Sequence, residues 1–191
     1  MGSFELSLAG ACRLLIIGHG RHGKDSVGDL LRERHGLRSV SSSEFAARHA
    51  VFPLVSDLYP DWRAAYEDRH AHRDLWFHAI RAYNLRPGPM LAEQILEAHD
   101  IYTGMRSRDE FERSRHLFDL VVWVDASDRL PPEPGGSMEL CAGDADWVID
   151  NNGAADALPG MIAQLAAHIA GTIRADRARR MVTQFGLMGI I

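Results

Sequence analysis

The chain has 191 residues and a mass of 21.3 kDa, a usual length for one domain with a substantial core. Because 46% of the residues are hydrophobic and 25% are charged, the composition excludes wholesale disorder and fibrous architecture. The net charge of −5 argues against broad nonspecific affinity for nucleic acid, but it leaves room for a local basic patch.

Neither a membrane span nor a disulfide framework is expected. The apolar run at residues 14–17 is far shorter than the roughly 20 residues of a membrane helix, and Arg13 interrupts the stretch that could imitate a signal peptide. Cys12 and Cys141 are too few for a disulfide framework and lack the spacing of metal ligands. We therefore expect a cytoplasmic protein with reduced thiols and no membrane partner.

Arginine greatly outnumbers lysine among the basic residues. Of 21 lysines and arginines, Lys24 is the only lysine. A genome rich in G and C explains many arginines, but it does not explain why one lysine persists. An ammonium is a compact charge on a flexible stem that can follow a moving phosphate, which a planar guanidinium in a tight loop cannot do. We therefore predict that the chemistry of this protein requires a lysine at position 24.

The first elements in chain order are a strand, a helix and a second strand. Residues 12–18 form a short, β-branched apolar run that ends in glycines, as a buried strand does. Val27, Leu30 and Leu31 then follow helical spacing, and Gly36 supplies a stop. Residues 37–40 are predicted as the second strand.

Residues 41–99 are predicted to be mostly helical. Ser43 is expected to cap a helix that starts at Glu44, and Asp61 a helix that starts at Trp62. Prolines at 87–89 break the chain before a further helix at 90–99.

The remaining chain alternates strands and helices. We expect strands at 100–104, 119–125 and 147–150, helices at 108–117 and 155–173, and a loop at 130–136. This alternation predicts a parallel sheet with helices on both faces, within one domain that spans residues 1–191. The 174–191 tail is basic and apolar, and it either contacts phosphates or ends a solvated helix; its arginines are Arg174, Arg177, Arg179 and Arg180.

The motif that carries chemistry lies between the first strand and the first helix. It reads Gly, four residues, Gly-Lys, and then Asp25 before Ser26, where the usual phosphate-binding loop has Ser or Thr directly. Glycines let successive backbone N–H groups face one centre, and the helix start adds partial positive charge. We expect Lys24 to bridge the β- and γ-phosphates and Ser26 to bind Mg²⁺. The predicted nucleotide site comprises Gly18, His19, Gly20, Arg21, His22, Gly23, Lys24, Asp25 and Ser26.

The Gly-Lys-Asp-Ser sequence resembles the loop of phage deoxynucleoside monophosphate kinases and related small P-loop kinases. Segments 101–106, 123–129 and 145–153 extend the likeness to most of residues 12–165. Their Gly-Met-Arg and Asp-Asn-Asn-Gly sequences are most similar to phage kinases thought to phosphorylate 5-hydroxymethyluracil in DNA, a step toward hypermodified thymidine. This resemblance implies a three-layer α/β P-loop NTPase fold, with a parallel five-stranded sheet like that of nucleoside monophosphate kinases.

The resemblance also implies roles for individual residues. Arg106 would face the phosphates or the acceptor, while Thr103 replaces an acid of the family's pattern. Asp125 fits a Walker B acid that binds the metal, or else a turn residue. Arg129 begins the segment 128–144 that serves as a lid, and it would neutralise charge on the transferring phosphoryl group. Residues 41–99 would form the acceptor region.

Taken together, the expected catalytic residues are Lys24, Asp25, Arg106 and Arg129, with ATP and Mg²⁺ as cofactors and Ser26 and Asp125 as metal ligands. Asp25 is the first choice of group to orient an acceptor hydroxyl, and Glu44 the second. The expected substrate is the 5-hydroxymethyl group of 5-hydroxymethyl-2′-deoxyuridine in phage DNA, in the host cytoplasm. A deoxynucleoside monophosphate is the alternative acceptor, and a non-catalytic nucleotide-binding regulatory module is the third reading.

Two further patterns carry open alternatives. Residues 62–86 interleave aromatic and basic side chains, which either contact nucleic acid or form an amphipathic helix pair with core aromatics. The histidine pairs at 19 and 22 and at 70 and 72 have no third ligand at helical spacing, so we do not expect metal sites there.

Overall fold

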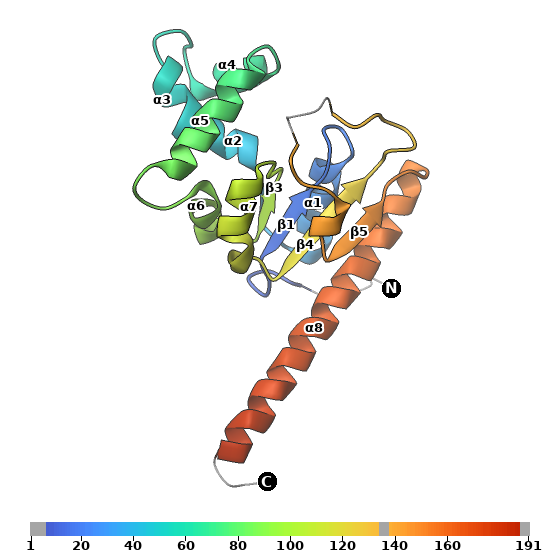
Figure 1. Ribbon diagram of the computed structural model, residues 1–191. Helices are drawn as coiled ribbons and strands as arrows, with labels where there is room; N and C mark the ends of the chain where they lie inside the picture. The colour runs from blue at the N-terminus through green and yellow to red at the C-terminus, as the bar shows by residue number, and fades with distance from the viewer. Residues whose placement is uncertain (1–6, 134–137, 188–191) are drawn as a thin grey trace.

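Five short strands form one parallel sheet at the centre of the molecule. The computed structural model describes residues 7–133 and 138–187, with side chains of the last helix described as far as residue 175. The strands are β1 Leu14–Ile17, β2 Ser39–Ser41, β3 Ile101–Thr103, β4 Leu120–Asp125 and β5 Trp147–Asp150. Their order is β2-β3-β1-β4-β5, and every pairing is parallel, which confirms the predicted sheet (Figure 1).

Helices and short helical turns connect the strands. The helices are α1 Lys24–His35, α2 Ser42–Ala46, α3 Phe52–Val55, α4 Trp62–Glu67, α5 Arg73–Leu85, α6 Leu91–Ala98, α7 Arg108–Ser114 and α8 Leu158–Leu187. A π-helical turn, η1, spans Ala47–Val51, and the 3₁₀ turns are η2 Asp68–His70, η3 Arg115–Leu117, η4 Ala142–Asp144 and η5 Ala155–Ala157.

Alternate residues of the strands pack into two separate cores. Leu15 and Ile17 of β1 pack in the core that includes α5, α6 and α7. Leu14 and Ile16 pack in the other core, which includes α1 and α8. Because successive strand residues point to opposite faces, strands covered on both faces are apolar throughout, as β1 is. The sheet is therefore the middle of three layers.

Glycines set both ends of α1. Gly23 precedes the helix with φ 100°, and Gly36 ends it with φ 72° while its N–H donates to the Arg32 carbonyl. Both are left-handed conformations that glycine adopts without strain. The predicted stop at Gly36 is confirmed. The second strand lies slightly later than the predicted 37–40, because Leu37 is buried before β2 begins.

The helical region 42–98 confirms the general prediction but corrects one cap. The helix expected to start at Glu44 begins at Ser42, so Ser43 lies inside the helix and does not cap it. The residue that precedes the helix, Ser41, makes no side-chain capping bond either. The wide turn η1 follows, just before Pro53, which has no N–H to donate to a helical bond. Asp61 caps α4 as predicted, accepting from the N–H groups of Arg63 and Ala64.

The last helix is longer than the predicted 155–173. After η5, α8 continues to Leu187, so residue 174 and those after it extend the helix. The side chains of Arg177, Arg179 and Arg180 lie outside the described residues, so their predicted contacts stay predictions. Within the described part of the chain, no helix has the length and apolar character needed to cross a bilayer.

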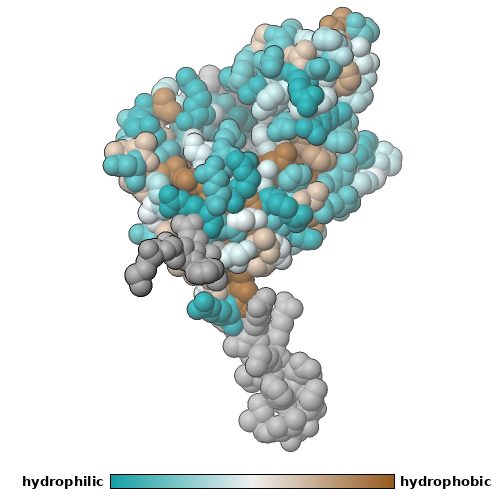
Figure 2. Space-filling model, turned by 180° about the vertical axis from the view of Figure 1, so that it is seen from behind, coloured by the Kyte–Doolittle hydropathy of each residue, from teal (hydrophilic) through white to brown (hydrophobic). Residues whose placement is uncertain are grey.

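Loops that follow β1, β3, β4 and β5 gather at the carboxyl edge of the sheet (Figure 1). Helices α2 to α5 rise on one side of this edge, and the segment after β4 lies over the sheet. Strand β1 is flanked by β3 and β4, so the chain order reverses there, which is where parallel α/β sheets bind ligands. Seen from behind, the surface is mostly hydrophilic, with hydrophobic residues in small groups (Figure 2).

Candidate functional site

The loop between β1 and α1 approaches its neighbours too closely for side chains at two of its glycines. A Cβ at Gly18 would lie 2.5 Å from the Val124 carbonyl oxygen, and Gly18 has φ 144°. A Cβ at Gly23 would lie 2.5 Å from Asn151 Nδ2. Between them, Arg21 has φ 66°, the only positive value for a non-glycine among the described residues. The loop thus holds a strained, tightly wound backbone, as an anion cradle requires.

Two strand ends hold this loop in place. His22 is fully buried, and its Nδ1 accepts a hydrogen bond of 3.0 Å from the Ala126 N–H, just after β4. Its carbonyl accepts a bond of 2.8 Å from Asn151 Nδ2, just after β5. The Asn151 N–H in turn donates to the Asp125 carbonyl at 2.7 Å. The loop is therefore tied to the sheet at its centre as well as at its ends.

Lys24 is half-buried at the start of α1. Its Nζ donates to the carbonyl oxygen of His19 at 2.6 Å, which folds the side chain back over the loop. Burial lowers the pKa of Lys24 to about 8, with a further lowering by Arg106, while Asp25 and Glu133 act in the opposite direction. The ammonium is thus a poorly solvated cation beside a second cation, an environment that favours an anion.

An anion does lie at this place, and it belongs to the chain itself. The carboxylate of Glu133 accepts a hydrogen bond from Arg106 Nη1, and its Oε1 lies against the backbone of Gly20, 2.8 Å from where a Cβ would stand. Arg73 Nη1, from the first turn of α5, lies 3.6 Å from the other carboxylate oxygen. Burial raises the pKa of Glu133, but the bond and the charge of Arg106 outweigh it and lower the pKa overall. Chemically, the carboxylate stands in for a bound phosphoryl group.

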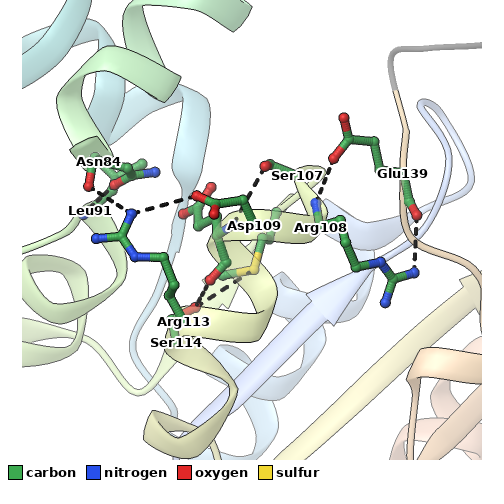
Figure 3. A network of polar contacts seen from close by, with 10 residues as sticks. Asn84, Leu91, Ser107, Arg108, Asp109, Arg113, Ser114 and Glu139 are labelled. Atoms are coloured by element: carbon green, nitrogen blue, oxygen red, sulfur yellow. Dashed lines mark hydrogen bonds and ion pairs between the residues drawn. The ribbon is translucent and has the colours of Figure 1, made fainter.

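Helix α7 positions Arg106 by gripping the chain on both sides of it. Arg108 Nη2 binds the carboxylate of Asp144 at 2.8 Å and the carbonyl of Glu139 at 3.1 Å. At the other end of the helix, Arg113 donates to the Asn84 carbonyl at 3.1 Å. Figure 3 shows these arginines reaching in opposite directions from one helix. The helix therefore links the helical region to the segment that follows Glu133.

A buried pair of polar side chains joins α7 to strand β3. Tyr102 of β3 donates its hydroxyl to Glu110 at 2.6 Å, and both side chains are buried. Burial raises the pKa of Glu110, which the hydrogen bond from Tyr102 partly offsets. This pair holds α7 against the sheet just beyond Arg106, so it is a structural support of the site.

Other predicted site residues lie apart from the Glu133 carboxylate. Asp125 directs a carboxylate oxygen to Ser127 Oγ at 2.9 Å and to Asn152 Nδ2 at 3.0 Å, which is a turn geometry. The exposed Arg129 donates through Nε to the Asn151 carbonyl at 2.9 Å. The metal role of Asp125 and the catalytic role of Arg129 stay predictions.

The remaining predictions concern exposed groups. Asp25 and Ser26 are exposed side by side in the first turn of α1, where the predicted Mg²⁺ ligand belongs. Glu44 pairs with Arg48 on its own helix at 2.9 Å, so its carboxylate already has a local partner. In the part of the chain that the structure describes, no group of three or more histidine, cysteine, aspartate or glutamate residues could hold a metal ion.

Several aromatic rings of the helical region make cation–π contacts with nearby arginines. Arg48 and Arg63 lie 4.1 and 4.6 Å from the centre of the Trp62 ring. Arg69 lies over Tyr66 at 4.0 Å, and Arg86 lies over Tyr83 at 3.9 Å. Trp76 is buried in the core. These cation–π contacts occupy ring faces that a nucleobase would need for stacking.

Sequence reasoning missed two residues of the site, Arg73 and Glu133. Arg73 appeared only among the basic residues of the helical region. It lies at an open cavity of about 380 Å³ whose lining is His70, Ala71, His72, Arg73, Asp74 and Leu75. One feature of the sequence could have pointed to Glu133. Pro131 and Pro132 precede it and restrict the backbone of the segment on which it lies.

Comparison with known proteins adds little to this geometry. No family model and no curated protein matches the chain. Among solved structures, shikimate kinase from Aquifex aeolicus vf5 matches with a TM-score of 0.43 and 13% identity, over 83% of this chain and 96% of that chain. A likeness of this size assigns no activity. The structure itself shows an α/β fold, with a five-stranded parallel sheet in the order β2-β3-β1-β4-β5 and a glycine-rich loop between β1 and α1.

Proposed function

We propose that this protein is a P-loop phosphotransferase that transfers the γ-phosphoryl group of ATP to an acceptor on a nucleotide. The observation that carries the proposal is one carboxylate, that of Glu133, which pairs with Arg106 and lies against the Gly20 backbone of the loop that precedes Lys24. Backbone amides at a helix start, with a lysine and an arginine, form the usual environment of a bound phosphate.

The residues present fit ATP and Mg²⁺. The pairing of the Glu133 carboxylate with Arg106 beside Gly20 supports an anion site at this place. Ser26 would supply a hydroxyl to Mg²⁺, which needs few protein ligands when phosphate oxygens and water provide the rest. When bound, Mg²⁺ neutralises part of the phosphate charge and orients the phosphate chain.

The chain itself contributes position and charge. Lys24 and Arg106 stabilise negative charge that develops on the transferring group. Asp25 is exposed next to Lys24, where it can accept a hydrogen bond from an acceptor hydroxyl and orient it.

Two acceptors follow from different observations. The 5-hydroxymethyl group of 5-hydroxymethyl-2′-deoxyuridine in phage DNA is proposed from the sequence resemblance. A free deoxynucleoside monophosphate is the second candidate, and the convergence of Arg73 and Arg106 on one carboxylate favours it, because a free 5′-phosphate needs such a clamp. The arginine-covered faces of Trp62, Tyr66 and Tyr83 also favour the second candidate over stacking on extruded bases.

Incubation with γ-labelled ATP and each acceptor tests the proposal. Label is expected in hydroxymethyluracil-containing DNA or in the mononucleotide, and the Lys24→Ala variant is expected to transfer none. Transfer to DNA alone supports the first acceptor, and transfer to the mononucleotide alone supports the second. Binding of ATP without transfer to any acceptor would favour the non-catalytic module instead.

A matched pair of variants reports on the acceptor clamp. Arg73→Ala is expected to raise the KM of the acceptor about tenfold with little change in the KM of ATP, since one charge-assisted contact is lost. Arg81→Ala, on an exposed position of the same helix, is the control. Equal effects of both variants would remove Arg73 from the acceptor site.

A further inference from the structure

We propose that Glu133 is an internal anion that occupies the phosphate-binding loop and must leave it before a nucleoside triphosphate binds. The inference rests on the proposed function, because it concerns the same loop. It adds a competition within the chain, in which one carboxylate holds the loop and two arginines in a nucleotide-free arrangement.

The contacts of Glu133 are those that a phosphate would make. Its side chain is only 11% exposed although it lies on a loop. One carboxylate oxygen binds Arg106, and the other lies 3.6 Å from Arg73 Nη1 and would lie 2.8 Å from a Cβ at Gly20. The carboxylate therefore packs against the loop backbone while it pairs with Arg106.

Occupation by Glu133 and by a phosphate cannot coexist. The carboxyl group lies directly against Gly20, with Oε1 2.8 Å and its carbon 3.1 Å from where a Cβ would stand, so a phosphate can reach this part of the loop only after the carboxylate leaves. Two anions at one poorly solvated place would also repel each other strongly. Lys24 points to the same resting state, since its ammonium is bonded to the His19 carbonyl and not to an anion.

The backbone of Glu133 is fixed to the loop as well. Its N–H lies 3.4 Å from His19 Nδ1, and two prolines precede it, which restricts the conformations of the segment. Departure of the carboxylate would remove one anion from beside both Arg73 and Arg106. Arrival of the triphosphate therefore lets an anionic group of the acceptor take the place of Glu133 beside these arginines, which makes ATP the first substrate to bind.

Calorimetric titration with a non-hydrolysable ATP analogue and Mg²⁺ tests this competition. Glu133→Gln keeps the shape of the side chain and removes its charge. If the carboxylate fills the site in most molecules, this variant is expected to bind the analogue about tenfold more tightly than the natural chain, because the competent fraction rises. Glu133→Ala is expected to bind at least as tightly as Glu133→Gln.

Glu139→Gln is the matched control, since it removes the same charge from the same segment. Glu139 accepts from the Arg108 N–H at 2.7 Å and does not reach the loop. Equal affinity of Glu133→Gln, Glu139→Gln and the natural chain would overturn the competition and leave the proposed function standing. Weaker binding by Glu133→Gln would likewise overturn it. Failure of every form to bind would overturn the proposed function, and the competition with it.

Discussion

Gly23 is a residue at which the loop between β1 and α1 tolerates little change. It has φ 100°, and a Cβ there would lie 2.5 Å from Asn151 Nδ2. That amide cannot retreat without losing its bond to the His22 carbonyl. We expect Gly23→Ala to lower the free energy of unfolding by about 1–3 kcal/mol, from backbone strain and the lost bond. Urea denaturation measures the change.

Gly153 provides the control for this substitution. A Cβ at Gly153 meets nothing within 4 Å, so Gly153→Ala is expected to change stability by less than about 0.5 kcal/mol. An equal loss in both variants would mean that the contact between Asn151 and the loop does not support the fold.

At the residue scale, prediction from sequence succeeded where the signal was local. The strand, the glycine spacing and the helix start lie within a few residues of each other, so the position of Lys24 could be inferred without knowing the fold. Glu133 could not be inferred in this way. Its contact with His19 joins residues 114 positions apart, and it depends on the path of a loop without regular structure.

At the scale of elements, the pair formed by Arg108 and Asp144 fastens α7 to the turn before β5. Its hydrogen bond holds the pKa of Asp144 down at about 2, below the ordinary 3.8. A carboxyl with a lowered pKa contributes stability that is fully present above pH 3.8 and is lost as the pH falls toward 2. We expect Asp144→Asn to lower the free energy of unfolding at pH 7 by about 1 kcal/mol.

The same variant has a pH signature. The difference between Asp144→Asn and the natural chain should shrink as the pH falls from about 4 to about 2, which denaturation at several pH values measures. Asp109→Asn is the control, because Asp109 is 54% exposed and its pair with Arg113 spans 3.5 Å. A pH-independent difference for Asp144→Asn would contradict the electrostatic role of the pair.

Element boundaries were predicted well only where a cap or a glycine marks them. Asp61 and Gly36 gave correct boundaries because each satisfies backbone groups at its own helix end. Ser43 gave a wrong one, since three serines in a row offer equivalent caps and the chain leaves β2 directly into α2. The wide turn η1 had no sequence signal beyond the nearby Pro53.

At the scale of the whole molecule, the sheet order explains why distant segments meet. Strand β1 lies between β3 and β4, so the glycine-rich loop after β1 is flanked by the residues that follow those two strands. This arrangement brings Arg106 near enough to Lys24 for its charge to lower the pKa of Lys24. The helical region could be recognised as helical, but its reach to the loop through Arg73 required the packing of α5 against the core.

The central claim is that the loop around Lys24 binds the triphosphate of a nucleotide. Titration of the natural chain and of Lys24→Ala with Mg-ATP, with circular dichroism to verify the fold, tests it most directly. We expect the natural chain to bind one ATP per molecule and the folded variant to lose at least about 100-fold in affinity, since a buried charge-assisted contact is removed. Equal affinity in the two forms, or no affinity in the natural chain, would contradict the account.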